Sequence, residues 1–109
     1  MKISFDFDET LSELYFQKLA KALVIAGVDV YIVTSRCNRL DIFGKPVGNI
    51  DLWAVAKYVG ITEDKVFFTE GAFKADTLSK LSMDIHFDDM SDEIYTIQLM
   101  TKCKGVNLK

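Results

Sequence analysis

The stretch KISFDFDET, residues 2–10, is the part of the sequence that decides how the fold is interpreted. It begins with apolar residues and other strand formers and closes with acids, which predicts a short strand ending at the acidic residues. Asp6 and Asp8 stand at that end, and Thr10 follows them. Residues just beyond the carboxyl end of a parallel strand lie in the crevice where ligands bind, so the two acids are candidate functional residues.

The rest of the chain alternates between segments typical of helices and segments typical of strands. Apolar runs bounded by polar residues or glycine predict further strands, and apolar residues at helical spacing after a capping residue predict helices. We expect a first strand over 2–7, later strands over 28–33, 66–68, 85–87 and 105–108, and helices over 12–26, 49–59, 73–81 and 91–100. This alternation predicts an α/β fold, with a single three-layer α/β/α domain over residues 1–109 and a Rossmann-like parallel sheet of about five strands.

The composition fits one folded domain and argues against several classes of protein. Half of the 109 residues are hydrophobic, and the formal net charge of −3 gives no general attraction to nucleic acid or anionic lipid. Cys37 and Cys103 are far apart and belong to no CxxC pair, so we expect neither a zinc site nor a disulfide framework. The N-terminus has acids where a signal peptide needs an apolar run, and no stretch approaches the roughly 20 apolar residues of a membrane span. These features indicate a reduced, cytoplasmic protein without a membrane partner.

Polar residues also follow the other predicted strands, at the same edge of the expected sheet. Thr34 and Ser35 follow the second strand, Lys74 opens the third helix, and Asp88 and Asp89 follow the fourth strand. Carboxylates brought together repel one another, and a hard divalent cation such as magnesium offsets that repulsion. A lysine and a hydroxyl group suit a phosphate, so the strand ends predict metal-assisted phosphoryl transfer.

At four places the sequence resembles the motifs of the haloacid dehalogenase (HAD) superfamily. FDFDETL (residues 5–11) is similar to the DxDxT signature, and VYIVTSR (residues 30–36) is similar to the second motif, an apolar strand ending in Thr or Ser. Lys74 stands where the third-motif lysine is expected, and IHFDD (residues 85–89) resembles the fourth motif, an apolar strand ending in acids. The motifs occur in the family's order and span nearly the whole chain. The resemblance implies a HAD-like phosphatase that uses Mg²⁺.

The resemblance implies a catalytic role for Asp6, Asp8, Thr34 and Lys74, and phosphate binding by Thr34, Ser35 and Lys74. Asp6 would attack phosphorus and form an aspartyl-phosphate, which is covalent catalysis by a carboxylate. Asp8 would protonate the leaving oxygen and then activate water for the second step. Thr34 and Ser35 would hold the phosphoryl group, and Lys74 would bind it and offset the charge on Asp6.

The resemblance also implies the magnesium ligands. Asp6 would contribute its second carboxylate oxygen, and Asp8 its backbone carbonyl. The fourth motif of the family has either adjacent acids or two acids spaced as DxxxD, and Asp88 belongs to both patterns here. We expect Asp88 to be a direct ligand, with Asp89 rather than Asp92 completing the set.

No segment has room for the cap domain that closes over the substrate in many family members. Residues 11–27 hold one expected helix, and residues 37–73 hold a loop, a helix and a strand. Without a lid the site stays open to solvent unless another surface covers it. The expected partner is therefore a phosphorylated small molecule, a phosphoprotein or a nucleic acid end, with a homo-oligomer as another way of covering the site. Glu9 replaces the Gly of many members, and the Asp-Glu-Thr variant resembles small phosphatases that act on phosphoprotein tails.

Three other functions stay open at this stage. A polynucleotide 3′-phosphatase would use the same chemistry on a nucleic acid end. A phosphoacceptor domain of the response-regulator type shares the sheet and the magnesium, but its phosphorylated Asp follows the third strand, where this chain has Thr69 and Glu70. A non-catalytic binding module would need none of these roles. His86, inside a predicted buried strand, is expected to be a core histidine rather than a catalytic one.

Overall fold

Five parallel strands form the middle layer of the protein in the computed structural model, which describes residues 1–108. The strands are β1 (Lys2–Phe5), β2 (Asp29–Thr34), β3 (Val66–Phe68), β4 (Ile85–Asp88) and β5 (Lys104–Asn107). Their spatial order is β3-β2-β1-β4-β5, so the first strand of the chain lies at the centre of the sheet. The predicted Rossmann-like parallel sheet is confirmed.

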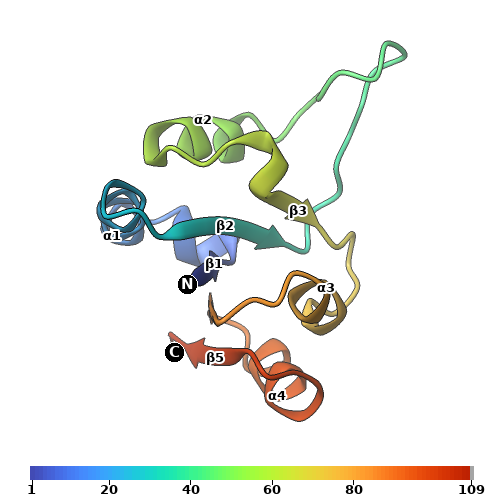
Figure 1. The fold of residues 1–109 in the computed structure, drawn as a ribbon. Helices are drawn as coiled ribbons and strands as arrows, with labels where there is room; N and C mark the ends of the chain where they lie inside the picture. Colours follow the sequence, from blue (N-terminus) through green and yellow to red (C-terminus); the bar gives the residue numbers. More distant parts are fainter. Residues whose placement is uncertain (109) are drawn as a thin grey trace.

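Two helices cover each face of this sheet (Figure 1). Helices α1 (Leu14–Ile25) and α2 (Ile50–Val59) pack against each other on one face, and α3 (Ala75–Lys80) and α4 (Ser91–Met100) on the other. The predicted three-layer arrangement is therefore confirmed. Within residues 1–108, none of the helices has both the length and the apolar character needed to cross a membrane.

Each face of the sheet has its own apolar core, because successive strand residues point to opposite sides. In β2, Ile32 is buried against α1 and α2, whereas Val33 is buried against α3 and α4. The same alternation puts Phe5 of β1 in the first core and Ser4 on the opposite side of the strand. A sheet covered on both faces gives strands with nearly continuous apolar sequences, which is the pattern that predicted them.

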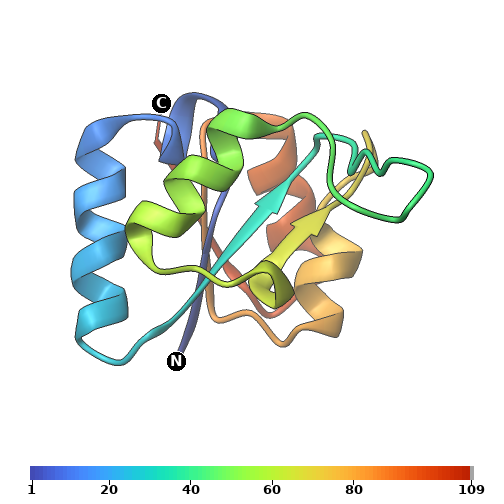
Figure 2. The ribbon, with the colours of Figure 1, turned by 90° about the horizontal axis from the view of Figure 1, so that it is seen from above.

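The boundaries of the first elements differ slightly from the sequence prediction. β1 ends at Phe5 rather than Phe7, and the chain then forms a tight turn, η1 (Phe7–Leu11), in which Glu9 has a positive φ of 57°. A second short turn, η2 (Glu63–Lys65), precedes β3. The predicted loop after β2 is confirmed and extends away from the layered body (Figure 2). The connections between the described strands contain no additional domain that could act as a cap.

Candidate active site

Residues that follow the strands meet in one cavity at the carboxyl edge of the sheet. Its volume is about 410 Å³. The turn after β1, the segment before α3 and the start of α4 all contribute to its walls. The lining residues are Asp6, Asp8, Glu9, Ser35, Gly71, Ala72, Phe73, Lys74, Asp89, Met90, Asp92 and Glu93. The structure thus brings together residues from all four sequence motifs.

A buried lysine joins two buried aspartates beneath this cavity. The Nζ atom of Lys74 donates hydrogen bonds to Asp6 Oδ1 at 2.9 Å and to Asp88 Oδ2 at 2.6 Å. Lys74 is 1% exposed and Asp88 is fully buried, while Asp6 is 5% exposed. Burying charged groups is costly unless they are paired and hydrogen-bonded, and these three groups satisfy one another.

Two neighbouring side chains hold this cluster in place. Glu93, in the first turn of α4, accepts a hydrogen bond from the backbone N–H of Lys74 at 3.0 Å, which connects α4 to the start of α3. Deeper in the sheet, His86 Nε2 lies 2.8 Å from Asp88 Oδ2, and His86 Nδ1 lies 2.7 Å from Ser4 Oγ. Ser4 and His86 are paired across β1 and β4, so the strand register itself places Asp88 beside Asp6.

The two aspartates titrate in opposite directions. Burial raises the pKa of Asp6 from 3.8 to about 7, against the attraction of Lys74 and with help from the like charge of Asp88. Burial also acts to raise the pKa of Asp88, but the hydrogen bond from His86 and the charge of Lys74 outweigh it and bring that pKa down to about 2. One carboxylate of the pair is therefore firmly ionised, and the other changes charge near neutral pH.

Three buried acids, at the floor of the cavity and directly beneath it, form a set that fits a divalent cation. Carboxylate oxygens of Asp6, Asp88 and Asp89 lie within 4.8 Å of one another, and all three residues are buried. An all-oxygen set suits a hard cation such as magnesium, which keeps waters in its remaining positions. Of the two acids considered as support for Asp88, the structure places Asp89 in this cluster, whereas Asp92 is exposed on the cavity wall.

The side chain of Asp8 lies apart from this oxygen cluster. Both of its carboxylate oxygens accept hydrogen bonds from Arg36, at 2.7 Å and 3.0 Å. Arg36 also donates two hydrogen bonds to Asp51 at the start of α2, at 2.7 Å and 2.9 Å, and its guanidinium stacks 4.7 Å from the centre of the Phe7 ring. Asp8 therefore stays at the mouth of the cavity, 54% exposed, as part of a pairing between η1 and α2.

The hydroxyl residues after β2 occupy different environments. Thr34 is fully buried, and its Oγ1 accepts a hydrogen bond from the backbone N–H of Arg36 at 3.3 Å. Ser35 is exposed and lines the cavity. Thr10, which closes the DxDxT run, is fully buried, and its Oγ1 has no hydrogen-bond partner among the described residues. Ser35 is thus the hydroxyl that a ligand in the cavity reaches directly.

Three contacts in and around the site were not predicted from sequence. They are the hydrogen bonds of Glu93 with Lys74, of His86 with Asp88, and of Asp51 with Arg36. His86 is a fully buried histidine, as expected, but its partner is the acid two residues later in the same strand. The available sequence signal for the His86 contact was the presence of one polar residue in each of two apolar strands, Ser4 in β1 and His86 in β4. The other two contacts depend on how α4 and α2 are packed, which no local pattern specifies.

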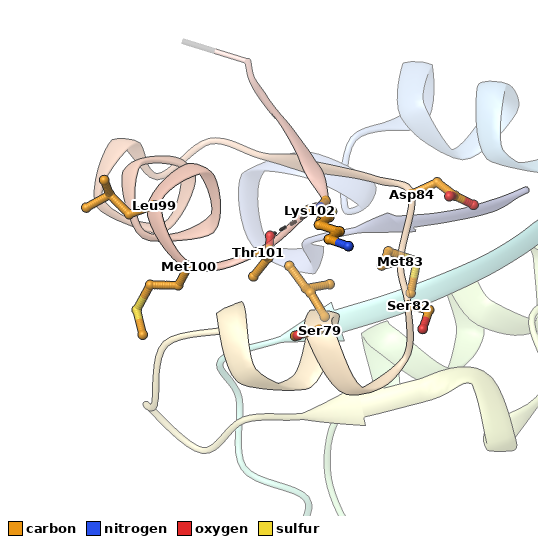
Figure 3. A pocket seen from close by; sticks show the side chains of 10 residues that line it. Ser79, Ser82, Met83, Asp84, Leu99, Met100, Thr101 and Lys102 are labelled. Atoms are coloured by element: carbon orange, nitrogen blue, oxygen red, sulfur yellow. Dashed lines mark hydrogen bonds between the residues drawn. The ribbon is translucent and has the colours of Figure 1, made fainter.

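A larger hollow, of about 610 Å³, lies at the opposite end of the strands, where β4 and β5 begin (Figure 3). It is formed by the ends of α3 and α4 and includes Leu99, Met100 and Met83 with Lys102 and Asp84 at its rim. The clustered acids and the buried lysine lie at the carboxyl edge instead, so we assign the candidate active site there. No protein-family model and no curated protein matches this chain.

Proposed function

We propose that the chain is a magnesium-dependent phosphomonoester hydrolase that acts through an aspartyl-phosphate on Asp6. The observation that supports the proposal is the buried Lys74 that joins Asp6 to Asp88, with Asp89 beside them, at the floor of an open cavity. A carboxylate nucleophile, a lysine and a cluster of oxygen ligands are the groups that phosphoryl transfer needs in one place.

In the proposed reaction an oxygen of Asp6 forms a bond to phosphorus while the bond from phosphorus to the ester oxygen breaks. Asp8, at the mouth of the cavity, first leaves Arg36 and takes up a proton, which it then gives to the departing oxygen. Water then attacks phosphorus and passes a proton back to Asp8, and phosphate leaves as the Asp6 carboxylate is restored. Lys74 stabilises the charge on Asp6 and on the phosphoryl group throughout.

Asp6, Asp88 and Asp89 would hold a magnesium ion, which would supply positive charge to the phosphoryl oxygens when bound. The ion would also relieve the repulsion among three buried carboxylates. Lys74 itself offsets part of that repulsion, because it pairs with two of the three carboxylates.

The proposal is tested by measuring hydrolysis of 4-nitrophenyl phosphate with magnesium and with a chelator. We expect activity only with the metal, and we expect Asp6→Asn to abolish it, because an amide cannot act as the nucleophile. Asp76→Asn is the matched control, since Asp76 is an exposed acid on α3 that pairs only with Lys80 on the surface. Full activity in Asp6→Asn, or undiminished activity in chelator, would remove the proposed mechanism.

A further inference from the structure

The walls of the candidate active site carry many negative charges and few positive ones. Six of the described lining residues are acidic and one, Lys74, is basic. Three of the acids, Asp8, Glu9 and Asp92, are exposed at the cavity walls rather than buried at its floor. A substrate entering the cavity therefore passes negative charge before it reaches the buried cluster.

The basic residues near the cavity are already paired with acids. Lys74 is buried between Asp6 and Asp88. Arg36 follows the cavity residue Ser35 in sequence, and its guanidinium binds Asp8 and Asp51 through two hydrogen bonds each. Proteins that bind nucleic acid neutralise several phosphates with lysine and arginine, and this cavity offers no such series of cations among its described lining residues.

The same cavity has an apolar side. Phe73 is 57% exposed and Met90 is 52% exposed, although both side chains are large and hydrophobic. Both line the cavity, directly next in sequence to Lys74 and Asp89 respectively. An aromatic ring and a thioether exposed beside a charged floor provide a surface on which an apolar group can be buried.

We infer that this site selects phosphomonoesters whose leaving group is apolar and either neutral or cationic, and that it discriminates against substrates carrying further negative charges. The inference rests on the proposed phosphatase function and specifies the substrate class of that site. Lys74 would hold the phosphate at the floor, together with any cation bound by Asp6, Asp88 and Asp89, and the leaving group would contact Phe73 and Met90. A second anionic group on the substrate meets the charges of Glu9 and Asp92 instead, whereas the charge of Asp8 is compensated by Arg36.

The apolar part is tested by comparing kcat/KM for benzyl phosphate and 2-hydroxyethyl phosphate. We expect a preference for benzyl phosphate that Phe73→Ala lowers about fivefold or more, because the variant removes apolar surface that the ring covers. Tyr95→Ala is the matched control, since Tyr95 is an exposed aromatic residue on α4 that does not line the cavity. The quantity compared between variants is the ratio of kcat/KM for benzyl phosphate to kcat/KM for 2-hydroxyethyl phosphate, because the intrinsic reactivity of each ester cancels in that comparison.

The charge part is tested with phenyl phosphates that carry either a 4-carboxylate or a 4-ammoniomethyl group, and with an oligonucleotide 3′-phosphate. We expect roughly tenfold higher kcat/KM for the cationic ester at low salt, shrinking as salt screens the exposed acids. The double variant Glu9→Gln, Asp92→Asn should remove most of that difference, while Glu63→Gln, an exposed acid outside this cavity, should not.

Four results would decide against the inference or against its basis. A benzyl preference unchanged by Phe73→Ala overturns the apolar contact, and equal or faster hydrolysis of the carboxylate ester overturns the charge selection. An oligonucleotide 3′-phosphate that is the best substrate overturns the inference while leaving the phosphatase function intact. Activity on none of these esters removes the proposed function, and the inference with it.

Discussion

At the scale of single residues, Lys74 is the residue that joins the buried acids of the site. Its ammonium group pairs with Asp6 and Asp88, and its backbone N–H donates to Glu93. The attraction of the two aspartates outweighs the effect of burial and raises the pKa of Lys74 above its usual 10.5, so the lysine stays charged at neutral pH. The residue therefore has a structural role in the metal-free protein as well as its proposed catalytic one.

Lys74→Met should destabilise the protein and abolish activity. The variant leaves two buried carboxylates without their cation, and breaking a buried ion pair in this way costs about 3 kcal/mol. Urea unfolding without divalent ions measures the loss. The control is Lys80→Met, whose exposed pairing with Asp76 contributes less than about 0.5 kcal/mol. Equal stability of the two variants would contradict the assigned role of Lys74.

The raised pKa of Asp6 predicts a pH dependence of stability. Between pH 3.8 and about 7 the native Asp6 holds a proton that the unfolded chain gives up, so its contribution to stability falls as pH rises through this window. The difference in free energy of unfolding between wild type and Asp6→Asn should fall by roughly 2–4 kcal/mol from about pH 4 to about pH 8. Urea titrations in chelator measure this difference, and a difference that stays constant from about pH 5 to about pH 8 would show that native Asp6 is ionised throughout that range.

At the scale of helices and strands, two glycines end the helices that pack on one face of the sheet. Gly27 follows α1 and Gly60 follows α2, with φ values of 87° and 97° that side-chain-bearing residues rarely adopt. Both positions therefore favour glycine for its backbone freedom. Only Gly60 also has a close neighbour, because a Cβ atom there would lie 3.2 Å from Val24 Cγ1 on α1.

Gly27→Ala and Gly60→Ala should separate backbone strain from crowding between the helices. We expect Gly27→Ala to lose about 1 kcal/mol of stability, because nothing lies within 4 Å of its added Cβ. Gly60→Ala should lose roughly 2 kcal/mol, since Val24 must also move. Thermal or urea unfolding of both variants gives the comparison. A smaller loss of stability for Gly60→Ala than for Gly27→Ala would mean that Val24 on α1 moves away from the added methyl group without an energetic cost.

The elements were predictable from sequence because each has its own local pattern. Residues 30–33 of β2 are apolar throughout because the strand is covered on both faces. Gly60 indicates the end of α2 because glycine readily adopts the left-handed backbone conformation found there. The convergence of Asp6, Lys74 and Asp88 followed from the rule that parallel strands end at one edge. The partner of Asp8 could not be predicted in this way, because Arg36 reaches it across the gap between η1 and β2 through a side-chain conformation that the local sequence does not specify.

At the scale of the whole molecule, binding of magnesium should stabilise the fold. A ligand that binds only the native state adds roughly 2.7 kcal/mol to the free energy of unfolding when its concentration is about 100 times its dissociation constant. We expect Asp89→Asn to remove most of this gain in stability and Asp92→Asn to retain it, because Asp89, unlike Asp92, lies in the oxygen cluster with Asp6 and Asp88. Thermal unfolding with and without magnesium measures both. The reverse result would assign the supporting ligand to Asp92 and the DxxxD pattern.

The central position of β1 has a consequence for how the protein forms on the ribosome. β1 is synthesised before the other described strands, and its two neighbours are β2, which begins at Asp29, and β4, which begins at Ile85. A nascent chain that has made β1, β2 and β3 therefore carries an unpaired strand edge, which is a surface prone to wrong association. The strand that covers this edge also delivers Asp88. The addition of β4 therefore covers the edge of β1 and brings Asp88 into the acidic cluster at the same late stage of biosynthesis.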